Sequence, residues 1–138
     1  MTPLNGKTLF NMVRQSFHVR SYWKVIVWYN LDYNFFHHVA DDLHNIGIPP
    51  KTVMEAHAML SSDKAKAVTI SNISYHESIV LFNIHNSRYD YINSLVHEAE
   101  HIKQAMLHAY NVEDSGEAPA YTIGYLVMRM FEVFKHIF

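Results

Sequence analysis

The feature that most restricts the fold of this chain is a long amphipathic segment that begins at Ser87 and ends at Tyr110. Ser87 is followed three residues later by Asp90, a capping pattern that satisfies free amide groups in a first helical turn. Apolar residues then recur at helical spacing: Leu95, Ala99, Ile102 and Met106. The sequence therefore predicts a helix over about 88–108, and other elements must cover its apolar face.

Strand and helix patterns alternate along the remainder of the chain. Over 18–29, β-branched and aromatic residues alternate with polar ones, which predicts a strand. Residues 78–84 hold a continuous apolar run, typical of a strand covered on both faces. The other predicted elements are a short helical face of Leu9, Val13 and Phe17, helices at 32–45, 52–60 and from near 118 to the C-terminus, and a strand at 67–73.

These elements predict an α+β fold. We expect a small, mainly antiparallel sheet with helices packed on one side, and an amphipathic helix that is followed by a C-terminal helix. The length of 138 residues fits a single domain spanning the whole chain, 1–138.

Composition narrows the classes of function. The absence of cysteine excludes disulfides and thiolate metal ligands, so any metal must be held by histidine and carboxylate. Eleven Lys and Arg against thirteen Asp and Glu leave no basic excess, which argues against nucleic acid as a partner. The first residues lack a signal-peptide pattern, and charged residues interrupt the apolar stretch 121–138. We therefore expect a cytoplasmic protein without a membrane partner.

The centre of the predicted helix carries the sequence His-Glu-Ala-Glu-His, which matches the pattern H-E-x-x-H. Residues four apart on a helix are stacked neighbours, so His97 and His101 can direct their imidazoles at one point. Glu98 lies about 100° round the helix from His97. There it is too far round to be a third metal ligand, but it is close enough to hold a metal-bound water. This is the geometry of a zinc hydrolase helix. A solvated face in a histidine-rich chain is the competing interpretation.

Two carboxylates compete for the role of general base. The same five residues also match the inverted pattern H-x-x-E-H, with Glu100 in place of Glu98. We favour Glu98, because the forward pattern agrees better with the candidate for the third ligand.

A catalytic zinc needs a third protein ligand and an open position for water. Glu117 is the favoured candidate, because Pro119 fixes the start of the next helix and a polar loop lets that helix fold back on the first. Its alternative role is an acidic residue that the helix dipole favours at an N-terminus. The rival ligands are Glu113, Asp114 and His108.

The spacing of these residues resembles a known family. His97-Glu98-x-x-His101, followed by Glu117 at the head of the next helix, is similar to the gluzincin zinc peptidases in their smallest form, the minigluzincins. The run from Tyr29 to Met130 also resembles small proteins of phages and mobile elements in gut bacteria. The matching stretches are 41–49, 69–72, 78–80 and the predicted helix at about 88–108, which we call the histidine helix.

The resemblance implies a zincin-like domain with zinc bound by His97, His101 and Glu117 and with Glu98 as general base. It also implies that an edge strand, expected at 78–84, takes a peptide substrate in extended form. Tyr121, four residues after Glu117, is the expected partner for the oxyanion, with Tyr125 next; both could instead be core aromatics.

Three functions compete at this point: a zinc-dependent peptidase acting on a peptide or protein, a zincin-like binding or regulatory module without hydrolysis, and a protein without metal. His37, Asp41 and His44 share one helical face and could bind a second metal or form a solvated surface. The apolar C-terminal helix makes a homodimer a further expectation.

Overall fold

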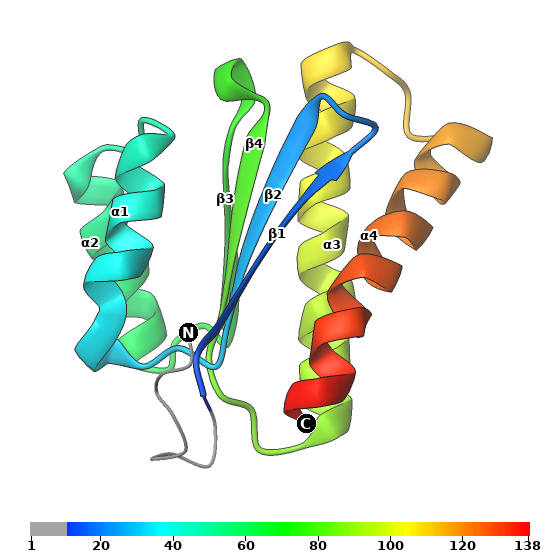
Figure 1. The fold of residues 1–138 in the computed structure, drawn as a ribbon. Coiled ribbons are helices and arrows are strands. Elements are labelled where there is room, and N and C mark those ends of the chain that lie inside the picture. Colours follow the sequence, from blue (N-terminus) through cyan, green and yellow to red (C-terminus); the bar gives the residue numbers. More distant parts are fainter. Residues whose placement is uncertain (1–10) are drawn as a thin grey trace.

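A four-stranded sheet lies between two pairs of helices in the computed structural model, which describes residues 11–138 (Figure 1). The strands are β1 (Val13–Val19), β2 (Trp23–Tyr29), β3 (Ala67–Asn72) and β4 (Glu77–Phe82), in the spatial order β1-β2-β4-β3. The pairs β1/β2 and β3/β4 are antiparallel, whereas β2 and β4 run parallel. The predicted α+β class with a mainly antiparallel sheet is confirmed.

The single strand predicted over 18–29 is interrupted: the range holds the end of β1, a turn at 20–22 and β2, so the chain forms a hairpin here. β1 and β2 pair in register around a tight turn, at which Arg20 and Ser21 adopt φ values of 60° and 76°. This turn holds no glycine or asparagine, the residues that usually indicate a hairpin turn, so the alternating pattern predicted one continuous strand. The helical face predicted nearby is wrong for Val13 and Phe17, which belong to β1, while Leu9 lies outside the described residues.

The strand predicted at 78–84 is not an edge strand. β4 lies between β2 and β3, and its residues after Glu77 are buried. This agrees with the continuous apolar run but corrects the expectation that this strand could receive a peptide. The edge on that side is β3, which packs over the histidine helix.

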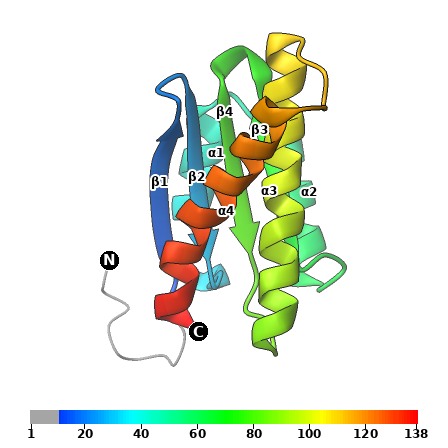
Figure 2. The ribbon, with the colours of Figure 1, turned by 90° about the vertical axis from the view of Figure 1, so that its right-hand side faces the viewer.

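Helices cover both faces of the sheet, which corrects the expectation that they pack on one side (Figure 1). α1 (Phe36–Asn45) and α2 (Pro50–Ser61) cover one face, and α3 (Arg88–Tyr110) and α4 (Glu117–Ile137) the other. The reason is that β2 and β4 carry apolar side chains on both faces, so each face needs a cover. α3 packs against β3, and α4 crosses the same face of the sheet obliquely toward β1 (Figure 2). No helix within residues 11–138 is long and apolar enough to cross a membrane.

Gly47 ends α1 in the left-handed conformation, with φ of 80°. A Cβ here would lie 3.3 Å from both Asn72 Nδ2 and Tyr75 Oη. Gly47→Ala is therefore expected to lower the free energy of unfolding by about 1–2 kcal/mol, measured by urea denaturation. Gly124→Ala is the matched control, because that glycine lies inside α4 with open space around it, and its substitution should stabilise the fold by about 0.5–1 kcal/mol. Equal losses in the two variants would contradict this explanation.

Candidate functional site

His97 and His101 lie one turn apart on α3, and both side chains are exposed. Their Nε2 atoms are 3.1 Å apart, and the two rings meet edge to face. Two nitrogens bound tetrahedrally to one zinc at about 2.0–2.1 Å lie roughly 3.3 Å apart. The helix alone therefore gives the imidazole pair a spacing that fits a shared metal ion.

Glu98 lies on the adjoining face of the same helix and is only 4 % exposed. Thr69, on the edge strand β3, donates a hydrogen bond of 2.7 Å to Glu98 Oε1. The carboxylate is thus buried against the edge strand of the sheet, while the two histidines next to it on α3 are exposed. This contact orients the side chain, and among residues 11–138 Thr69 is the hydrogen-bond partner of the Glu98 carboxylate.

Glu100, the alternative base, belongs to a separate polar network. Gln104 donates to its carboxylate at 2.8 Å, and Lys103 forms an ion pair at 3.0 Å. These bonds, that of Gln104 first, hold the pKa of the Glu100 carboxyl below its ordinary value. An ionised carboxylate fixed by a cation is a poor proton acceptor, so the geometry distinguishes the two glutamates.

Asp114 joins the same network from the loop between α3 and α4. Its carboxylate pairs with Lys103 at 3.0 Å and accepts from Gln104 at 2.8 Å. The lysine, followed by the glutamine, lowers the pKa of the Asp114 carboxyl. This rival metal ligand therefore fastens the loop to α3, while Glu113 beside it is exposed.

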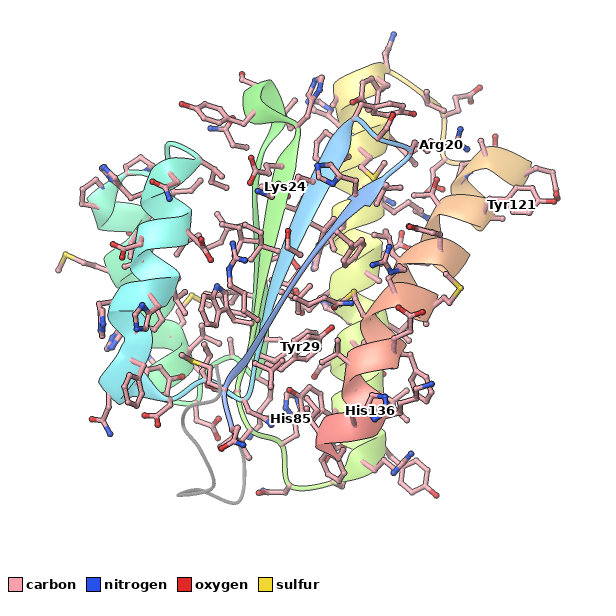
Figure 3. The ribbon with its side chains drawn as sticks, in the orientation of Figure 1. Arg20, Lys24, Tyr29, His85, Tyr121 and His136 are labelled. Carbon is pink, nitrogen blue, oxygen red and sulfur yellow. The ribbon has the colours of Figure 1, made fainter. Side chains whose placement is uncertain are left out.

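Glu117 and Tyr121 lie away from the histidine pair. Ala118, next to Glu117, lines a hollow with Leu107. Leu107 lies about 9 Å further along α3 than His101, because each helical residue advances by about 1.5 Å. Tyr121 is 69 % exposed and lines a second hollow at the β1–β2 turn; the side-chain view shows it near Arg20 (Figure 3).

The structure therefore brings His97 and His101 together, with Glu98 on the adjoining face, and leaves Glu117 and Tyr121 apart. Within residues 11–138, no group of three or more His, Asp or Glu side chains is arranged to hold a metal, and this includes the candidate second site on α1. The donor set fits two of the three protein ligands of a catalytic zinc.

A second polar arrangement was not expected from the sequence. His85 and Ser94 form a hydrogen-bonded pair at the opposite end of the sheet from Tyr121 (Figure 3). His85 lies in the loop between β4 and α3, whereas Ser94 lies within α3, so no helical or strand spacing could have indicated the pair.

Comparisons of this chain with protein-family models, with curated protein sequences and with solved structures gave no match.

Proposed function

We propose that this protein is a zinc-dependent peptidase whose metal is held by His97 and His101. The observation that carries the proposal is the 3.1 Å separation of the two Nε2 atoms on an exposed face of α3. Such a pair supplies two neutral nitrogen ligands without any rearrangement of the backbone. A bound zinc would polarise a scissile carbonyl and lower the pKa of its own water.

The residues around the pair support hydrolysis of a peptide. Glu98 provides a carboxylate that can accept a proton, and Thr69 fixes its orientation. β3 lies at the sheet edge above the same helix, and no described strand pairs with its outer side. An extended peptide could add to that edge through backbone hydrogen bonds, which would bring it beside the histidines.

The third ligand proposed on the family resemblance is Glu117. It begins α4, apart from the histidine pair, so this part of the proposal rests on the resemblance rather than on contacts. Substitution of Glu117 therefore tests the ligand set separately from the two histidines.

A second candidate function is a metal-binding module without hydrolysis. The burial of Glu98 and its hydrogen bond with Thr69 favour it, because a glutamate used only for packing would have these contacts. The two candidates share the metal and differ in whether Glu98 acts on a substrate.

Metal content tests the proposal directly. Mass spectrometry of protein purified without a histidine tag should find about one zinc per chain, lost in both His97→Ala and His101→Ala. His136→Ala removes an exposed histidine of α4 and should retain the zinc, which makes it the matched control. If Glu117→Ala retained its zinc, a residue other than Glu117 would be the third ligand. A wild-type protein that binds no added zinc would contradict both candidates.

A further inference from the structure

The connections of the sheet diverge at the carboxyl ends of its two parallel strands. The segment after β2 leads to α1 on one face, and the segment after β4 leads to α3 on the other (Figure 1). In open α/β sheets, the space outside such a divergence is a preferred place for ligands. At this end of the sheet, polar residues follow both strands: Asn30, Asn83 and His85.

His85 lies at this end of the sheet and makes several contacts there. The side chain is 3 % exposed, and its ring stacks on Tyr91 with 4.4 Å between the ring centroids. Its Nδ1 lies 2.8 Å from the backbone carbonyl oxygen of Asn83. Its Nε2 lies 2.8 Å from Ser94 Oγ on α3. Both ring nitrogens are thus engaged, one with a carbonyl and one with a hydroxyl.

These contacts determine which atom carries the proton. A carbonyl oxygen can only accept, so His85 Nδ1 must donate to Asn83. In the neutral ring, Nε2 then has a free lone pair, and the Ser94 hydroxyl donates to it. A nucleophile bonded to a base that a third group orients is the arrangement of nucleophilic catalysis.

Burial keeps the ring neutral. Desolvation is the largest influence on the pKa of His85 and lowers it, and the nearby charge of Lys66 acts in the same direction. The bond to Asn83 and the charges of Asp90 and Asp63 oppose this shift without reversing it. The uncharged form that can take a proton from Ser94 is therefore the form present at neutral pH.

Ser94 opens onto a hollow with donors on its wall. The hollow is lined by Lys66, His85, Asn86, Asp90, Asn93 and Ser94. The side-chain amides of Asn86 and Asn93 are hydrogen-bond donors, the type of group that stabilises an oxyanion; the Lys66 ammonium is paired with Asp63 at 2.9 Å.

We propose that Ser94 is an acyl-transfer nucleophile, with His85 as its base, acting on small carboxylic esters. Ser94 Oγ forms a bond to the carbonyl carbon while its proton passes to His85 Nε2. The bond from that carbon to the alcohol oxygen breaks, and the alcohol leaves with the proton from His85. Water then forms a bond to the acyl carbon and gives a proton to His85 Nε2; the bond from that carbon to Ser94 Oγ breaks, the acid leaves, and the proton passes from His85 to Ser94 Oγ.

This site is separate from the proposed zinc site. Ser94 lies about one helical turn before His97 on α3, and neither Ser94 nor His85 is a proposed metal ligand. Chelation of metal should therefore leave the reactivity of Ser94 intact, so that failure of one proposal does not decide the other.

A fluorophosphonate with a small alkyl group is a suitable probe, because it forms a stable bond to an activated serine oxygen with loss of fluoride. Peptide mapping by mass spectrometry should locate one adduct on Ser94, formed equally in EDTA. The adduct should be lost in Ser94→Ala and retained in Ser115→Ala, which removes an exposed loop serine. Labelling in His85→Gln should be slower by about 10²-fold or more.

The pH profile gives a second readout that needs no variant of the buried histidine. The labelling rate should fall as the pH drops below the ordinary histidine value, because protonated His85 can no longer accept the Ser94 proton. Circular dichroism of Ser94→Ala should match the wild type. An unlabelled Ser94, or a labelling rate on Ser94 that is constant through this pH range, would overturn the proposal.

Discussion

Tyr91→Ala is expected to lower the free energy of unfolding by about 3–5 kcal/mol, the usual cost of truncating a large buried aromatic residue. Tyr91 has no exposed surface and joins α3 to the sheet and to α4. Its ring centroid lies 5.5 Å from that of Phe82, 5.2 Å from that of Phe134 and 5.9 Å from that of Phe138. A domain of ordinary stability has only about 5–15 kcal/mol in total, so urea denaturation followed by circular dichroism should show a much lower midpoint.

Tyr91→Phe separates the ring from its hydroxyl. The hydroxyl donates at 3.1 Å to Asn30 Oδ1, whose own amide nitrogen has no hydrogen-bond partner among the described residues. Removing the hydroxyl leaves a buried oxygen without this donor and should cost about 1–3 kcal/mol, less than the alanine substitution. If the phenylalanine variant were as unstable as the alanine variant, the hydrogen bond rather than the packing of the ring would be the main source of stability.

Local patterns in the sequence predicted most of the elements. α3 begins at Arg88 as expected, and Ser87 caps it by accepting from the Asp90 amide. The hairpin turn was missed because Arg20 and Ser21 reach positive φ without glycine. The cover of both faces was also missed, although the continuous apolar run of 78–84 indicated it; which pair of helices takes which face depends on how they pack against the completed sheet.

In the candidate site, too, the sequence predicted contacts within one helix but not contacts between elements. A single helix places His97 beside His101, so their spacing in sequence was enough to predict the pair. The position of Glu117 depends on how α4 packs on α3 and on a loop that Asp114 fastens to Lys103. His85 and Ser94 meet because the loop after β4 packs against the second turn of α3, which no local pattern predicts.

Glu98→Gln is expected to slow peptide hydrolysis by about 10²–10⁴-fold while zinc remains bound, a prediction that rests on the proposed function. The amide keeps an oxygen that can accept the hydrogen bond from Thr69, so the fold should be retained. What it loses is the ability to take a proton. The measurement is kcat/KM on a quenched fluorescent peptide mixture, with zinc content and thermal unfolding determined on the same samples.

Glu100→Gln is the matched control, since it changes the other carboxylate of the motif in the same way. Glu100 is bonded to Lys103 and Gln104, and its substitution should leave hydrolysis nearly unchanged. A large loss in Glu100→Gln together with an active Glu98→Gln would assign the base to the inverted pattern. Activity that survives both substitutions would contradict glutamate catalysis at this helix and favour the metal-binding module.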